Sequence, residues 1–154
     1  MAIEPFQTAE GSEFPLVRQI SVFVENRLGQ LLRLTKLFEK SEVHIVALSV
    51  DSSVDCAIVR MLVDEPDLAE EMLHDAGFAT TETEVLVVEL PPGNRGIMIV
   101  CSALLTGEIN INYTYALMPG PERGACIAIQ VDNPQAASII LAKKHFRMLD
   151  QSTL

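Results

Sequence analysis

An internal duplication constrains the fold of this 154-residue chain more than any other feature of its sequence. Residues 63–69 read VDEPDLA and residues 131–137 read VDNPQAA, which sets an offset of 131 − 63 = 68 residues, and Phe78 aligns with Phe146 at the same offset. Further upstream the offset is 97 − 31 = 66, and it aligns Leu31, Leu34 and Phe38 with Ile97, Val100 and Leu104. Similarity at a fixed spacing indicates that one structural unit occurs twice.

The difference between the two offsets, 68 − 66 = 2, means that the second unit carries two additional residues. They fall between the two middle strands, where the polar segment 51–55 of the first unit corresponds to the longer segment 118–124 of the second. Because hairpin loops tolerate insertions, we predict that 118–124 is the loop of a hairpin.

The first unit begins with signals for a strand, a helix and a hairpin. Apolar residues at every second position of 19–24 are typical of a strand. From residue 30 to residue 40 the apolar residues recur at helical spacing, which indicates an amphipathic helix. The β-branched runs 43–50 and 57–63 are joined by a short polar segment, so we predict a β-hairpin there.

A second helix and a fourth strand complete the unit. Pro66 is suited to begin the helix and Gly77 to end it. The buried face of this helix is predicted to contain Leu68, Met72, Leu73 and Ala76. The fourth strand lies within 78–90 and runs without a linker into the second unit. The resulting order is that of a ferredoxin-like fold, and we predict an α+β protein of two tandem βαββαβ units, each an antiparallel sheet with its helices on one face.

We expect an N-terminal extension at residues 1–17, a first domain at 18–84 and a second domain at 85–154. Residues 97–106 begin with a β-branched run typical of a strand, but the repeat predicts a helix. That helix would be apolar on nearly every side, and such a helix is an association site if it is exposed. We therefore hypothesise that another unit or another subunit covers it, and that the protein is a homo-oligomer, most simply a dimer.

Composition and charge narrow the classes of partner. Hydrophobic residues make up 49% of the chain, which indicates a globular protein with a real core. The formal net charge of −10 disfavours nucleic acid as a partner. No segment is apolar over the ~20 residues that a membrane span needs, and no signal peptide is recognisable, so we expect a cytoplasmic protein with no membrane partner. Cys56, Cys101 and Cys126 are far apart, and we expect each to be a small buried side chain.

Several motifs in the correct order resemble the ACT-domain family, in particular small proteins made of two tandem ACT units. The resemblance covers about residues 19–148 and rests on ISVFVE at 20–25, NRLGQL at 26–31, VHI at 43–45, VDEP at 63–66 and AGF at 76–78. Leu28 stands where family members usually have a proline before the loop glycine. In the second unit the segment PPGNRG at 91–96 keeps the length of the loop but moves the glycine by one position.

The resemblance implies a regulatory protein that binds a small ligand, typically a free amino acid, at the interface between paired ACT units. A glycine-containing loop that opens a helix presents unpaired backbone N–H groups, which suit a carboxylate. The implied ligand-binding residues are Asn26, Arg27, Leu28, Gly29, Gln30 and Leu31, with His44, Ile45, Val46 and Ala47 of a neighbouring unit. A weaker second site would contain Asn94, Arg95, Gly96, Ile97, Asn110, Ile111 and Asn112.

Some of these residues also have simpler explanations. Gly29 suits a tight turn from strand to helix whether or not a ligand binds there. Asn26 and Asn110 suit turns or helix caps. The acidic run at 64–67 is interpreted as a solvated helix start, because acidic residues interact favourably with the positive end of the helix dipole.

The sequence predicts no catalytic residue, no metal and no cofactor. His44, His74 and His145 stand in three different elements without partners at metal-ligand spacing. No nucleophile with a base and no phosphate-binding loop is recognisable, which disfavours an enzyme. The leading hypothesis is a non-catalytic amino-acid sensor. Its alternatives are a regulatory subunit of a separate amino-acid biosynthetic enzyme, such as acetolactate synthase, and a structural interaction domain without a ligand.

Overall fold

The computed structural model describes residues 15–154, and most of the predicted N-terminal extension, residues 1–14, lies outside the described residues. The elements of the first unit are β1 (Val17–Glu25), α1 (Gln30–Lys36), β2 (Ile45–Ser52), β3 (Cys56–Val63) and α2 (Pro66–Asp75). Those of the second unit are α3 (Gly96–Thr106), β5 (Ile111–Ala116), β6 (Cys126–Val131), α4 (Pro134–Lys143) and β7 (Met148–Leu149), followed by a 3-10 turn at Gln151–Thr153. The strand β4 (Ala79–Glu89) lies between these two sets.

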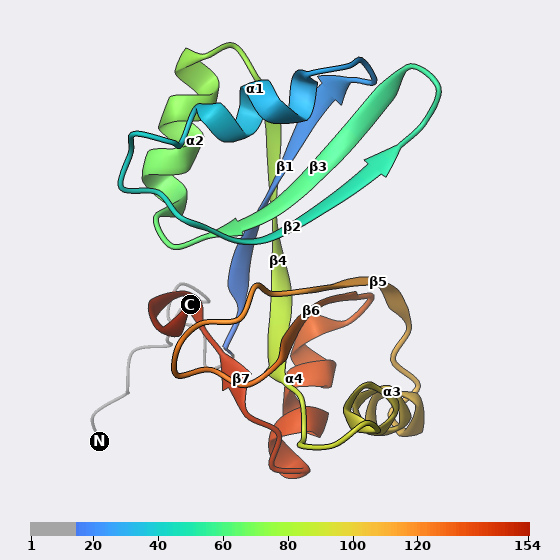
Figure 1. Cartoon of the computed structure of the whole chain (residues 1–154). Coiled ribbons are helices and arrows are strands. Elements are labelled where there is room, and N and C mark those ends of the chain that lie inside the picture. The colour runs from blue at the N-terminus through green and yellow to red at the C-terminus, as the bar shows by residue number, and fades with distance from the viewer. Residues whose placement is uncertain (1–14) are drawn as a thin grey trace, which may run out of the picture.

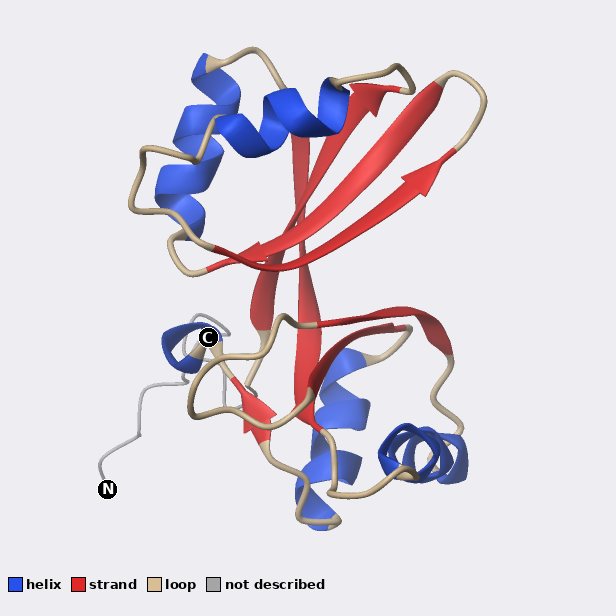
Figure 2. Cartoon of the chain, in the orientation of Figure 1, coloured by secondary structure: helices blue, strands red, loops and turns tan. Residues whose placement is uncertain are grey.

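The two units share β4. Its first part, Ala79–Val85, pairs antiparallel with β1, and its last part, Leu86–Glu89, pairs antiparallel with β6. The strand order is β2-β3-β1-β4-β6-β5, and β7 pairs with β4 beside this path. Figure 1 shows β4 running through both units, and Figure 2 shows the helices of each unit packed beside its strands. The fold of two tandem ferredoxin-like units is thus confirmed, while the domain boundary at 84/85, which falls within β4, stays a prediction.

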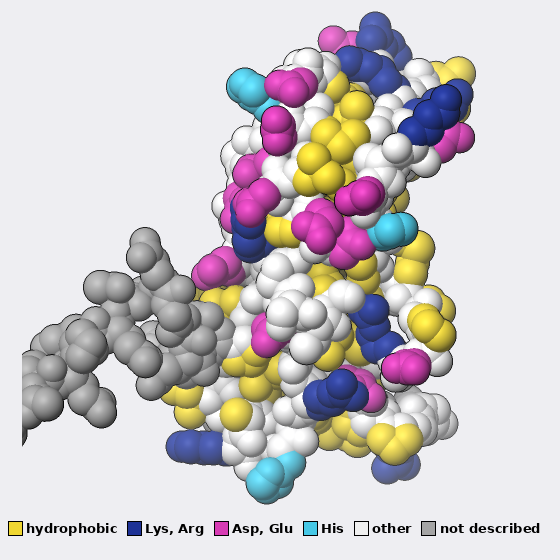
Figure 3. All heavy atoms as spheres, turned by 90° about the vertical axis from the view of Figure 1, so that its left-hand side faces the viewer, with side chains coloured by type: hydrophobic (Ala, Val, Ile, Leu, Met, Phe, Trp, Pro, Cys, Tyr) yellow, Lys and Arg dark blue, Asp and Glu magenta, His cyan; other side chains and the backbone are white. Residues whose placement is uncertain are grey.

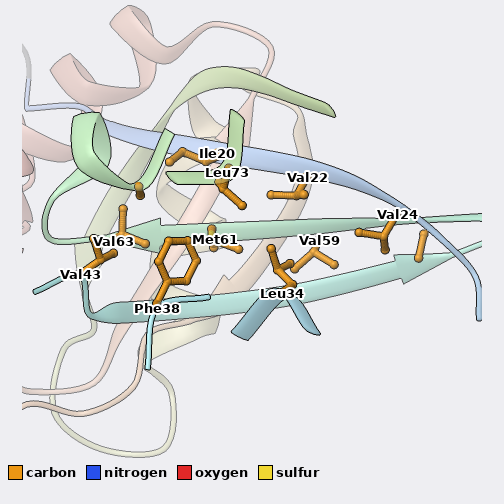
Figure 4. Packing of buried hydrophobic residues seen from close by; sticks show 12 residues of the cluster. Ile20, Val22, Val24, Leu34, Phe38, Val43, Val59, Met61, Val63 and Leu73 are labelled. Atoms are coloured by element: carbon orange, nitrogen blue, oxygen red, sulfur yellow. The ribbon is translucent and has the colours of Figure 1, made fainter. Parts of the chain in front are cut away.

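The helix-facing side of each sheet carries its own aliphatic core. In the first unit, Leu34 and Phe38 from the α1 region and Leu73 from α2 pack on side chains of β1 and β3, as Figure 4 shows. The second core is built in the same way, with Val100 and Leu104 from α3 and Leu141 from α4 packed on the strands of the second unit. These residues are buried because the apolar positions of each helix recur on one side.

A third apolar cluster lies between the two units. Successive side chains of a strand point to opposite faces, so Leu86 and Val88 enter the second core while Val85 and Val87 belong to the third cluster. Ala47 of β2 forms a bridge with Leu117, just after β5, and these two residues also belong to the cluster. The curled sheet therefore joins its two outer strands, and the seam between the units is filled with side chains.

A buried polar group lies at this seam. Gln19 is fully buried, and its amide nitrogen donates to Thr83 Oγ1 at 3.1 Å and to the Tyr113 hydroxyl at 2.8 Å, while its amide oxygen accepts from the Tyr115 hydroxyl at 2.7 Å. The Arg60 guanidinium stacks 4.1 Å from the centre of the Tyr113 ring. Burial raises the pKa of Tyr115 above its ordinary value, so its phenol remains a donor further into the alkaline range than an exposed tyrosine would. One side chain of the first unit thus holds two tyrosines of the second.

An ion-pair cluster ties α2 to the sheet of the first unit. The Arg18 guanidinium on β1 has three acidic neighbours. Its Nε lies 2.6 Å from Glu82 Oε1 of β4, its Nη1 lies 2.7 Å from Asp67 Oδ1, and its Nη2 lies 3.8 Å from Glu70 Oε2. The hydrogen bond to Glu82 is the main cause that raises the pKa of Arg18 above its ordinary value. On the face of the molecule that Figure 3 shows, acidic side chains gather over the first unit.

Three expectations about individual residues are wrong. The helix predicted to end at residue 40 ends at Lys36, and i→i+3 hydrogen bonds continue the chain as turns that bring Phe38 into the core. Leu68 is 37% exposed, since α2 buries Pro66, Ala69 and Leu73 instead. Cys126 is buried as expected, but the side chains at residues 56 and 101 are exposed.

Replacing Gln19 by leucine is expected to lower the free energy of unfolding by about 2 to 3 kcal/mol, because the hydroxyls of Tyr113 and Tyr115 would lose their partner in a buried place. The matched control is Gln135→Leu, at an exposed position of α4, which should change it by less than about 0.5 kcal/mol. Urea unfolding of the three proteins measures both. Equal stabilities of the two variants would contradict a role for this amide in joining the units.

Candidate ligand-binding site

The loop between β1 and α1 leaves backbone N–H groups unpaired at the start of a helix. Gly29 precedes α1 with φ at 85°, a left-handed conformation that glycine adopts without strain. The next backbone bond of the helix runs from the Arg33 amide to the Gly29 carbonyl at 2.9 Å. Within residues 15–154, the amides of Leu31 and Leu32 have no hydrogen-bond acceptor, so two donors remain at the start of α1.

The loop is anchored to the β2–β3 hairpin by Asn26. Its side-chain nitrogen donates to the Ser53 carbonyl at 2.6 Å, and its backbone amide donates to the Asp55 carbonyl at 3.2 Å. Asn26 therefore positions the loop through the protein itself. Beside it, Leu28 is fully exposed and Leu32 is 58% exposed, which gives the loop an apolar rim.

The predicted second wall, residues 44–47, lies at the beginning of β2. The Asp64 carboxylate accepts from the His44 backbone amide and from its Nδ1, both at 2.7 Å. Ile45 packs on the first core, and the Val46 carbonyl accepts from the Met118 amide at 2.8 Å. Ala47 is fully buried at the seam. Only His44 of these four residues presents a largely exposed side chain.

A single unit does not bring the loop and this strand segment together. Glu25, at the end of β1, pairs with Cys56, whereas Ile45 pairs with Val63 at the other end of β3. At about 3.3 Å per residue, the eight residues of β3 separate the two places by roughly 23 Å. A pocket that contains both needs a loop from one unit and a strand from another.

The corresponding loop of the second unit has a different geometry. Its left-handed residue is Gly93, with φ at 100°, whereas Arg95 precedes α3 with φ at −105°. Gly96, the first residue of α3, is buried, and a Cβ there would lie 2.9 Å from the Pro91 carbonyl oxygen. Gly93 thus supplies the left-handed turn within the loop. The residue directly before α3 lacks the left-handed conformation that Gly29 has before α1. Asn94 is exposed in this loop and Ile97 is exposed on α3.

The remaining residues of the weaker site form a hydrogen-bonded row. The Asn110 side chain donates to Asn112 Oδ1 at 2.9 Å, and Asn112 in turn donates to Gln130 Oε1 at 2.5 Å. Ile111, between them, packs on the second core. The amide groups of Asn110 and Asn112 are thus already used in hydrogen bonds within the protein.

An aspartate clip, overlooked in the sequence, occurs in both units. The Asp64 carboxylate holds the His44 amide, and the Asp132 carboxylate holds the Asn110 amide at 3.2 Å. In return, the amide of each aspartate donates to the carbonyl of the residue it holds, at 3.2 Å in both units. Interpreting the acidic run as a solvated helix start missed this contact. The VDxP spacing shared by the two copies was the signal that could have revealed it.

No group of three His, Cys, Asp or Glu side chains in residues 15–154 is arranged to hold a metal ion. Over the same residues, none of the helices has both the length and the apolar character needed to cross a bilayer.

The chain matches one family model over almost its whole length, and several solved structures have a similar fold. The model of the family described as "ACT domain pair" matches residues 16–154. No curated protein sequence matches the chain. The crystal structure of protein BT0572 from Bacteroides thetaiotaomicron is 26% identical, with a TM-score of 0.83 over 91% of this chain and 96% of that one.

Two more distant structures share the fold. The regulatory subunit of aspartate kinase from Thermus thermophilus, in its ligand-free form, has a TM-score of 0.59 and 11% identity, over 86% of this chain and 94% of that one. The regulatory subunit of aspartate kinase from Thermus flavus has a TM-score of 0.52 and 12% identity, over 85% and 93% of the two chains.

Removing the clip of the first unit by Asp64→Ala should destabilise the start of β2. The His44 amide would lose its acceptor, at a cost of about 1 to 1.5 kcal/mol, which corresponds to roughly tenfold faster exchange of that amide through local opening. Hydrogen exchange measured by NMR tests this, with the Asn110 amide of the intact second clip as the internal control. Unchanged protection of His44 in the variant would contradict the clip.

Proposed function

This chain belongs to the ACT domain pair family, and on that basis we propose that it is a non-catalytic sensor that binds a free amino acid between ACT units. ACT domain pairs are regulatory domains, so this chain is a regulatory module. The amino-acid ligand, the residues that hold it and the cytoplasmic location are the parts that we propose. Residues 26–31 form one wall of the site and residues 44–47 the other, in which His44 presents the largely exposed side chain.

The observation that carries the proposal is the start of α1. Two backbone amides without acceptors among residues 15–154, those of Leu31 and Leu32, lie two and three residues after a left-handed glycine, and Asn26 anchors the loop to the β2–β3 hairpin. A carboxylate accepts hydrogen bonds from such amides and gains from the positive end of the helix. The exposed side chains of Leu28, Leu31 and Leu32 supply apolar surface for the rest of an amino acid.

The second wall comes from another copy of the chain. Since the loop and residues 44–47 lie at opposite ends of β3, one protomer contributes the loop and its partner contributes the strand. The apolar surface of α3 supports association: it contains no charged residue, and Ile97, Met98 and Leu105 are each more than half exposed. A homodimer of this kind holds two equivalent sites.

Ligand binding must favour one state of the dimer to be useful for regulation, by a coupling free energy of about 1 to 3 kcal/mol. A second candidate function is a regulatory subunit of a separate amino-acid biosynthetic enzyme. It is supported in kind by the two Thermus structures, whose names describe regulatory subunits of an enzyme. In that case a catalytic polypeptide would co-purify with the chain.

A thermal-shift screen against the twenty amino acids tests the site when it is combined with Gly29→Asp. A ligand at a hundred times its Kd adds about 2.7 kcal/mol to the free energy of unfolding, and so raises Tm of the natural chain. The variant should lose this increase, because it places bulk and negative charge where the carboxylate binds. If none of the twenty amino acids raises the Tm of the natural chain, the result would favour a structural role without a ligand.

Gly77→Asp is the matched control for this variant. Gly77 has a φ of 83°, close to the 85° of Gly29, and a Cβ added at either position would meet no neighbouring atom, so the two substitutions impose similar strain and the same charge. The control should lower Tm at least as much, because its carboxylate stands at the negative end of α2, and it should keep the ligand response. A variant at Gly29 that still responds would move the site elsewhere.

A further inference from the structure

A cavity of about 270 Å³ lies under the loop between β5 and β6, in the second unit and away from the α1 loop. Gly120, Pro121, Glu122 and Arg123 of that loop form one side, and Arg147, Leu149 and Thr153 form the other. The loop is the segment lengthened by two residues relative to the first unit. The cavity is therefore a feature that the duplication does not account for.

Two guanidinium groups line this cavity, and one of them is incompletely bonded. The Arg123 Nη2 donates to the Leu154 carbonyl at 3.3 Å, whereas its Nη1 has no exposed surface and no hydrogen-bond partner among residues 15–154. Because Nη1 is covered by protein atoms, Arg123 faces the cavity through the other atoms of its side chain. The backbone at Gly120 lies directly against this guanidinium, since a Cβ there would be 3.3 Å from Nη2.

The second guanidinium belongs to Arg147, whose Nη1 lies 3.1 Å from Glu89 Oε2. Glu89 Oε2 is also buried without an aligned hydrogen bond from residues 15–154, so this pair is an ion pair and not a well-formed hydrogen bond. The thiol of Cys126 lies near the same charged groups. Burial is the main cause that raises its pKa, the charge of Glu89 raises it further, and the charges of Arg123 and Arg147 lower it. The charged groups thus surround the beginning of β6.

We propose that this cavity binds a small monoanionic carboxylate, with its oxygens on Arg123 and Arg147 and its apolar part against Pro121 and Leu149. Guanidinium groups match carboxylates in shape and charge. The cavity volume of about 270 Å³ lies near the lower end of the roughly 300 to 1,000 Å³ typical of small-molecule sites, which suits a small organic acid. Glu122 on the lining and the nearby Glu89 disfavour a dianion such as phosphate.

An NMR titration of the full 15N-labelled chain with sodium propionate, at constant ionic strength, tests this site. We expect saturable shifts of the amides of Gly120, Arg123 and Thr153, and none with propionamide, which has the same shape without the charge. Shifts confined to residues 26–31 would belong to the site of the proposed function and would count against this one. Equal shifts with propionamide, or tighter binding of inorganic phosphate, would overturn the assignment.

Arg123→Gln should weaken propionate binding about tenfold, because a charge-assisted hydrogen bond is lost. Lys40→Gln removes the same charge from an exposed place in the first unit and should leave the affinity unchanged. Arg147→Gln, at a side chain that is 69% exposed, gives a second variant expected to weaken binding if Arg123→Gln does not fold. Unchanged affinity in a folded arginine variant would refute the site.

Discussion

The pairing of β4 with both sheets is the constraint on which the rest of the structure depends. A strand whose first seven residues pair with β1 and whose last four pair with β6 leaves no hinge between the units. The bridge between Ala47 and Leu117 closes the curled sheet from the other side, and Gln19 fixes the seam by binding both tyrosines of β5. Backbone hydrogen bonds and a packed core therefore connect the two units without a break, which is the kind of physical network that a regulatory module needs.

Duplication gave the two units the same core and the same aspartate clip, but the surfaces have diverged. Before α1 the left-handed glycine directly precedes the helix, while in the second unit it has moved to Gly93 and a buried Gly96 packs against Pro91. The exposed helix faces correspond, since Leu32 and Met98 align at the offset of 66 and both are more than half exposed. The first unit thus combines a left-handed glycine with unpaired amides at its helix start, and α3 of the second unit exposes more large apolar side chains than α1 does.

The fold was predictable from the sequence because the repeat gave each weak signal a second copy. Residues 97–100 are β-branched in part, yet they lie in α3, because tertiary packing overrides local propensity. Exposure was harder to predict, since an apolar neighbourhood in sequence does not fix which side of a helix faces water: Cys101 is exposed on α3 and Leu68 on α2. The candidate residues were found as two segments, but their separation by the length of β3 follows only from the strand register.

The central claim is that each amino-acid site is built from the loop of one protomer and the strand of its partner, and subunit mixing tests it most directly. Calorimetry would follow binding of the amino acid identified by screening to Gly29→Asp, to His44→Glu and to an equimolar, re-equilibrated mixture of both. Each variant alone should bind nothing, while mixed dimers regain one intact site, or about a quarter of all sites. A mixture that remains silent, or a His44→Glu variant that binds unaided, would contradict the shared site.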